Sequence, residues 1–105
     1  VDDQNVADIL IDLTRRETKQ FSNQFAQVMV ESLKHKTQMI NNPHRSAGFR
    51  VLKAPDVPSV LVELGYLSNP EDEKSVSDPK WQAGLADEMA EAIRIYAGKQ
   101  MTARQ

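Results

Sequence analysis

Glu63 is the residue of this sequence whose surroundings most favour chemistry. It lies near the end of residues 59–65, a short apolar stretch that contains a single carboxylate. A stretch of this length, rich in β-branched residues, predicts a buried strand, and a lone buried carboxylate is costly unless it is paired, protonated or bound to a metal. Ligands of open α/β sheets bind just beyond the carboxyl ends of the strands. Glu63 is therefore a candidate acid or base, and the alternative is a strand-terminal glutamate that turns into solvent.

Two histidines and an arginine, His35, His44 and Arg45, are the next candidates for a site. A metal site needs at least three converging ligands, whereas this segment supplies two imidazoles, nine positions apart. Arg45 could bind an anionic group of a substrate, although a surface arginine is the default interpretation. The sequence alone leaves the roles of these three residues open.

Composition excludes several classes of function. The chain has 105 residues, enough for one small domain, and a formal net charge of −2 with acidic and basic residues interspersed. This balance predicts no surface for nucleic acid or for an anionic membrane. The absence of cysteine excludes disulfides, thiolate metal sites and cysteine nucleophiles. We expect no transmembrane segment, and residues 1–4 show no signal-peptide features, as would also hold for a mature chain.

Two apolar faces predict helices in the first third of the chain. Helical spacing over residues 4–13 places one face at Val6, Ile9, Leu10 and Leu13. Residues 14–17 fit a capping box that would start a second helix at Thr14. The second face, rotated in phase, comprises Phe21, Phe25, Val28, Met29 and Leu33. The pattern allows two helices or one long kinked helix. We expect the second face to pack in a core, and the first to pack on the rest of the domain or to meet a partner helix.

The middle of the chain predicts a sheet. Residues 35–48 form a connection, residues 49–53 alternate as a strand does, and a link with two prolines leads to the buried strand at residues 60–64. Two strands make no stable sheet by themselves, and a strand buried on both faces needs a neighbour on each side. We therefore predict an α/β fold, the C-terminal part of a mostly parallel sheet flanked by helices, with a long N-terminal helical segment.

Two helix starts are predicted in the C-terminal third. Asn69 can cap a helix that begins at Pro70, with three acids in its first turn, where the helix dipole favours them. Asp78 and Pro79 repeat this pattern for the last helix. Gly98 is the expected end of that helix, which leaves residues 99–105 as a flexible tail. The apolar stripe of the last helix predicts core packing and comprises Trp81, Leu85, Met89, Ile93 and Tyr96.

Residues 49–71, with the sequence FRVLKAPDVPSVLVELGYLSNPE, resemble the C-terminal signature of the zinc-dependent N-acetylmuramoyl-L-alanine amidases of the Amidase_3 type. The matching features are a VLVE strand and the Gly-aromatic-Leu-Ser-Asn-Pro turn after it. The resemblance extends to HKTQ at residues 35–38, typical of the Gram-negative periplasmic branch that acts in daughter-cell separation, and to ADILIDL at residues 7–13. In that branch such a segment closes an insertion whose helix blocks the active site until an activator with a LytM-type domain displaces it.

The resemblance implies a hydrolase that cleaves the amide between N-acetylmuramic acid and L-alanine of the peptidoglycan stem peptide. It also implies a zinc ion held by two histidines and a glutamate in upstream motifs that are absent here, so neither His35 nor His44 is assigned as a ligand. Glu63 matches the family's catalytic glutamate, which would take a proton from the attacking water and return it to the leaving amine. The chain alone is expected to be inactive. The implied location is the periplasm, and the implied partners are peptidoglycan, the rest of the amidase domain and a LytM-domain activator.

The resemblance also divides the chain. Residues 1–13 would be the end of a helical regulatory insertion, residues 14–98 the C-terminal half of the amidase catalytic domain, and residues 99–105 a flexible tail. Two alternatives stay open: a non-catalytic cell-wall binding or regulatory module on the same scaffold, and a structural piece that docks on the missing half. An acid at the end of a buried strand favours the enzyme, because a binding module has no need of it.

Overall fold

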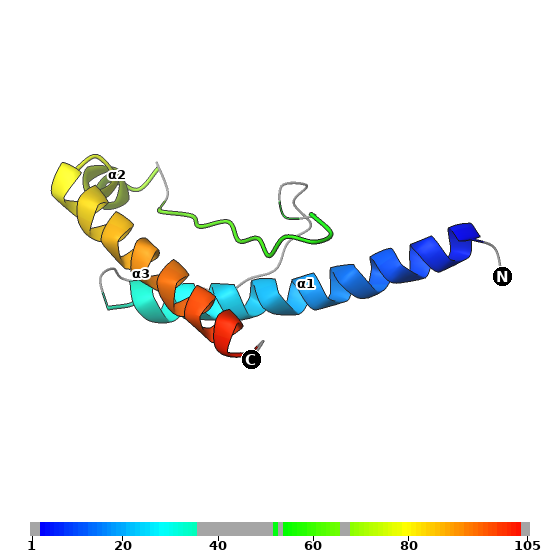
Figure 1. Cartoon of the computed structure of the whole chain (residues 1–105). Coiled ribbons are helices and arrows are strands. Elements are labelled where there is room, and N and C mark those ends of the chain that lie inside the picture. Colours follow the sequence, from blue (N-terminus) through cyan, green and yellow to red (C-terminus); the bar gives the residue numbers. More distant parts are fainter. Residues whose placement is uncertain (1–2, 36–51, 53, 66–67, 104–105) are drawn as a thin grey trace.

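The computed structural model describes residues 3–35, 52, 54–65 and 68–103. Over these residues the chain forms three helices, α1 (Asp3–Leu33), α2 (Pro70–Val76) and α3 (Pro79–Ala103). Figure 1 shows that α3 crosses the C-terminal half of α1, while the N-terminal half of α1 projects away from the crossing. An extended segment, residues 54–65, runs along the pair of helices and leads towards α2.

α1 is a single helix of 31 residues, so of the two alternatives offered by the sequence the break near Thr14 is wrong. The hydroxyl of Thr14 donates a hydrogen bond to the carbonyl of Leu10, at 2.9 Å, as threonines inside helices commonly do. Thr14 is therefore an interior residue, and the capping box predicted for residues 14–17 does not form.

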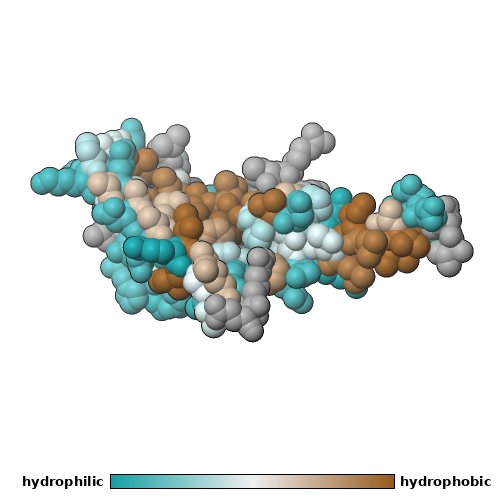
Figure 2. All heavy atoms as spheres, in the orientation of Figure 1, coloured by the Kyte–Doolittle hydropathy of each residue, from teal (hydrophilic) through white to brown (hydrophobic). Residues whose placement is uncertain are grey.

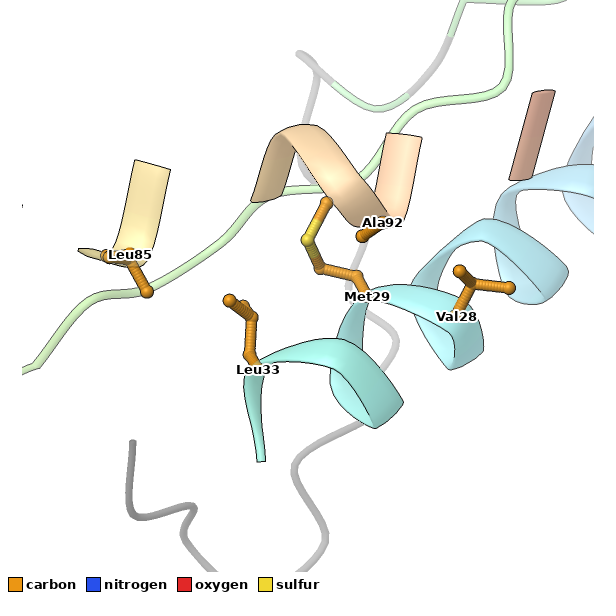
Figure 3. Close-up of a cluster of buried hydrophobic side chains, with 5 residues drawn as sticks. All are labelled: Val28, Met29, Leu33, Leu85 and Ala92. Atoms are coloured by element: carbon orange, nitrogen blue, oxygen red, sulfur yellow. The ribbon is translucent and has the colours of Figure 1, made fainter. Parts of the chain in front are cut away.

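The core lies where α1 and α3 cross, and it is small. Ala92 is fully buried, and its small side chain lets the backbone of α3 come close to α1. Beside it, the rings of Phe25 and Tyr96 lie 4.7 Å apart between centroids and are tilted by 32°. The predicted packing face of α1 is thereby confirmed over its C-terminal part. The buried members of the cluster, drawn in Figure 3, are Val28, Met29, Leu33, Leu85 and Ala92.

Two expectations for α3 are wrong. Ile93 is 52% exposed, because the stripe that begins at Leu85 and Met89 continues through Ala92 at helical spacing. Gly98 does not end the helix, which continues to Ala103. A glycine inside a helix costs only about 1 kcal/mol relative to alanine, and here the carbonyl of Gly98 accepts a hydrogen bond from the hydroxyl of Thr102 at 3.0 Å.

The predicted α/β fold with a mostly parallel sheet is wrong for the part of the chain that the structure describes, because none of those residues belongs to a strand. Residues 60–64 are extended as expected (Figure 1), but the prediction that they are buried on both faces is wrong, because Leu61 and Leu64 are 52% and 45% exposed. A strand exists only through ladder hydrogen bonds to a neighbour, and no other described segment runs beside them as a strand. Of the second strand expected, at residues 49–53, only Leu52 is described.

The molecule is elongated, with extents of 58 × 35 × 23 Å and a radius of gyration of 17.1 Å. A compact domain of this length would have a radius of gyration of about 13 Å. The apolar face near the start of α1, the N-terminal stripe, is exposed, and Figure 2 shows an apolar patch at this end of the molecule. No described helix combines the length and hydropathy of a membrane span. The members of the N-terminal stripe, 43–58% exposed, are Val6, Ile9, Leu10 and Leu13.

We expect the isolated 105-residue chain to unfold with little or no cooperativity. Ordering the backbone costs about 1–2 kcal/mol per residue, whereas each fully buried large apolar side chain returns only about 1.5–3 kcal/mol, and few are buried here. Thermal melting followed by far-UV circular dichroism measures this, with sedimentation to establish that the sample is monomeric. A sharp two-state transition of the monomer would contradict the expectation.

Candidate functional site

Glu63 lies near the end of the extended segment, on the side that faces solvent. Val60 and Val62 are half-buried, and Val62 packs against the core cluster, whereas Leu61 and Glu63 are exposed. Successive side chains of an extended chain point to opposite sides, so the inner valines hold the backbone and the carboxylate is presented outward. The desolvation cost expected for a buried carboxylate does not arise in this arrangement, which leaves Glu63 accessible to water and to a substrate.

Two hydroxyls of α1 attach the beginning of the segment. Thr18 donates a hydrogen bond from Oγ1 to the carbonyl of Pro55, at 2.8 Å. The backbone N–H of Ser59 donates to Oγ of Ser22, also at 2.8 Å. Sequence reasoning missed both residues. The signal that could have found them is a pair of hydroxyls one helical turn apart, beside the apolar face of α1.

Gly65 lies two residues after Glu63 and close to α2. Gly65 has a φ of +151°, a conformation that favours glycine, and a Cβ at this position would lie 3.1 Å from the Cβ and Cγ of Asp72. The side chain of Asn69 then caps α2, because its Oδ1 accepts hydrogen bonds from the backbone N–H of Glu71 at 2.9 Å and of Asp72 at 3.2 Å. The predicted cap at Asn69 and the predicted first position of Pro70 are confirmed. The first turn of α2 is thus packed directly on the backbone that follows Glu63.

The start of α3 follows the same chemistry. Asp78 accepts a hydrogen bond from the backbone N–H of Lys80 at Oδ1, at 3.0 Å, and α3 begins at Pro79. This confirms the helix start that the sequence predicts. The caps at Asn69 and Asp78 therefore fix where α2 and α3 begin, and α3 then crosses α1.

A hollow of about 740 Å³ lies between α1 and α3, and its lining includes no residue of the extended segment. Glu31, one of its lining residues, accepts a hydrogen bond from Lys34, with 2.7 Å between Nζ and Oε2. This bond, together with the positive charge of Lys34, lowers the pKa of Glu31. Because Glu63 takes no part in this hollow, the hollow and the candidate acid do not form one site.

The candidate metal ligands are not brought together. His35 is exposed in the turn after α1, and His44 and Arg45 lie outside the described residues. Within the described ranges, no three histidine, aspartate or glutamate side chains gather as a metal ion requires. The described residues therefore do not fit a zinc site by themselves.

Comparison with known proteins finds similarity along most of the chain. Residues 7–95 match the family profile described as Amidase_3, N-acetylmuramoyl-L-alanine amidase. The chain is 33% identical over 92 residues to N-acetylmuramoyl-L-alanine amidase AmiC of Neisseria meningitidis serogroup B, which covers 88% of this chain and 22% of AmiC. It is 31% identical over 88 residues to N-acetylmuramoyl-L-alanine amidase AmiA of Escherichia coli K12, covering 84% of this chain and 30% of AmiA.

A third relative comes from Staphylococcus. The probable cell wall amidase LytH of Staphylococcus saprophyticus is 35% identical over 71 residues, which is 68% of this chain and 24% of LytH. The chain therefore spans between 22% and 30% of the length of these relatives.

Replacing Asn69 with alanine should destabilise the start of α2 by about 1 kcal/mol, because two backbone donors lose their acceptor. Amide hydrogen exchange measured by NMR should then be about fivefold faster at Glu71 and Asp72. Asn69→Asp keeps an acceptor oxygen and is the matched control, so its exchange rates should stay near those of the original chain. Equal rates in all three chains would contradict a capping role.

Proposed function

The chain belongs to the N-acetylmuramoyl-L-alanine amidase family, and we propose that it forms part of an enzyme that hydrolyses the amide between N-acetylmuramic acid and L-alanine of the peptidoglycan stem peptide. The observation that carries the proposal is the placement of Glu63. Its carboxylate is exposed, while the backbone on both sides is held by α1, by the core and by the start of α2. Because the chain spans 22–30% of its relatives, the activity is proposed for the parent protein that contains it.

The role proposed for Glu63 follows from what amide hydrolysis requires. The attacking water must lose a proton, and the leaving amine must gain one. A carboxylate held at the end of a fixed segment can accept the first proton and deliver it to the amine. The exposed position of Glu63 leaves room for a polymeric substrate on that side of the segment. Peptidoglycan is accordingly the proposed partner.

Zinc is proposed as the cofactor of the parent protein, with its ligands outside this chain. Family membership supports zinc as the cofactor. The ligands are placed outside this chain because no three metal-binding side chains gather among the described residues. No described side chain is assigned to the metal. The isolated chain is accordingly proposed to be inactive, and the rest of the amidase domain is its first partner.

We also propose that the parent protein works in the periplasm and is controlled by an activator with a LytM-type domain. The N-terminal stripe of α1 supports a regulatory role, because four apolar side chains lie exposed on one face of a helix. In this proposal residues 1–13 end the regulatory insertion and residues 14–98 belong to the catalytic domain, while residues 99–103, expected in a flexible tail, are the last residues of α3.

A second candidate is a non-catalytic cell-wall binding module on the same scaffold. Such a module would need neither a metal ion nor a proton acceptor at Glu63. The two candidates differ in metal content and in the consequence of removing the carboxylate of Glu63, so one set of variants separates them.

In the parent amidase, Glu63→Gln should lower the release of soluble fragments from purified peptidoglycan by roughly 10²–10⁴-fold, because the side chain keeps its size and loses its proton acceptor. Bound zinc should stay at about one ion per chain. Glu71→Gln is the matched control, since Glu71 is an exposed glutamate nearby, in the first turn of α2. Its activity should stay close to that of the original enzyme.

Two results would overturn this assignment. Activity of Glu63→Gln within a few-fold of the original would make Glu63 a structural residue. A parent protein that binds peptidoglycan without zinc and without releasing fragments would be a binding module.

A charged substitution in the N-terminal stripe should change the ratio of activator-dependent to basal activity by several-fold. Leu10→Glu places a charge on the apolar face, whereas Ile11→Glu is a matched control at an exposed apolar residue off that face. Rates of fragment release with and without activator measure the effect. Lower thermal stability with an unchanged ratio would show that the stripe serves packing only.

A further inference from the structure

Thr18 and Ser22 of α1, here called the hydroxyl pair, hold the chain that leads to Glu63. Thr18 bonds to the carbonyl of Pro55 and Ser22 to the N–H of Ser59, and both bonds join residues that are 37 positions apart. Thr18 and Ser22 are four residues apart on the helix, and their partners Pro55 and Ser59 are four residues apart in the segment. The two elements are therefore locked in a single register.

That register requires the segment to bend. Four residues of helix rise about 6 Å, whereas four residues of extended chain would span about 13 Å. The difference is taken up by a bend at residues 55–57, where the hydroxyl of Ser59 donates to the carbonyl of Val57 at 2.9 Å. The hydroxyl pair thus holds both ends of a bend. The bend shortens the distance that the chain spans between Pro55 and Ser59, before the chain continues to Glu63.

The bend depends on side chains from α1, because its own backbone has few donors. Pro55 and Pro58 have no N–H, and the described segment has no neighbouring strand to bond with. Thr18 is only 8% exposed and is the one buried polar residue among those described. Removal of its hydroxyl would leave the Pro55 carbonyl without this partner in a partly buried place.

The backbone that the hydroxyl pair holds is close in sequence to Glu63. Three residues after Ser59, Val62 packs against the core cluster, to which α1 contributes Val28, Met29 and Leu33. Glu63 is the next residue, and two positions later Gly65 packs against Asp72. The segment is therefore held at two places, by hydrogen bonds from α1 at the bend and by apolar contact with the core cluster of α1 and α3 beside Glu63.

We propose that Thr18 and Ser22 are positioning residues for Glu63 in the amidase reaction, an inference that rests on the proposed function of Glu63. They act by holding the bend of the segment in one register on α1. This fixes the position of the Glu63 carboxylate relative to the substrate. A misplacement of about 1 Å far from the chemistry can lower a rate by about 10²-fold. Loss of a hydroxyl therefore lowers kcat and leaves KM nearly unchanged, since substrate binding on the rest of the domain is untouched.

The test uses the parent amidase and purified peptidoglycan. Thr18→Val keeps the shape of the side chain and removes its hydroxyl, and it should lower kcat by about tenfold or more with little change in apparent KM. Thr18→Ser keeps the hydroxyl and should restore kcat to within a few-fold of the original. Ser22→Ala should act in the same direction as Thr18→Val. Thr14→Val is the matched control, because the Thr14 hydroxyl bonds only within α1, to Leu10.

A double-variant comparison separates positioning from general destabilisation. If Thr18 acts through Glu63, adding Thr18→Val to Glu63→Gln should not lower the residual rate further. An equal loss in both backgrounds, or a Thr18→Val enzyme as active as Thr14→Val, would overturn the proposal while leaving the role of Glu63 intact. An active Glu63→Gln enzyme would overturn it together with the proposed function.

Discussion

An extended segment without a neighbouring strand has to be held by side chains, and this requirement governs the arrangement around Glu63. Buried backbone groups need partners, yet residues 54–65 have no strand beside them in the described part of the chain. Hydroxyls of α1 bond to the backbone at the bend, apolar contacts hold Val62, and Asp72 in the first turn of α2 lies close to Gly65. The crossing of α3 over α1 makes these supports possible, because it supplies the cluster against which Val62 rests.

The same arrangement explains why a small core and a large apolar surface coexist. The buried cluster occupies only the crossing, while the N-terminal stripe, the outward side of the segment and parts of α3 remain exposed. Leu61 and Leu64, on either side of Glu63, are 52% and 45% exposed. The carboxylate therefore has accessible apolar side chains as its neighbours in the segment.

The hollow between α1 and α3 illustrates why size alone does not identify a site. Its volume is about 740 Å³, whereas a second hollow has a volume of about 330 Å³. The smaller one is lined by Thr18, Asp56 and Pro58, next to the bend of the segment. The hydrogen bonds of Thr18, Ser22 and Ser59 lie at this bend, next to the smaller hollow.

Local chemistry allowed the sequence by itself to determine the helix starts at Asn69 and Asp78 and the packing face at Val28, Met29 and Leu33. A cap depends on residues two or three positions away, and a helical face depends on spacing alone. The motif around Glu63 likewise indicated both the family and the candidate acid before any fold was known. Only the tertiary structure decided that residues 60–64 pair with no other described segment, that Ala92 rather than Ile93 is buried, and that Thr18 and Ser22 hold the segment. Strand pairing, burial and contacts across 37 positions depend on residues remote in sequence, and no local pattern specifies them.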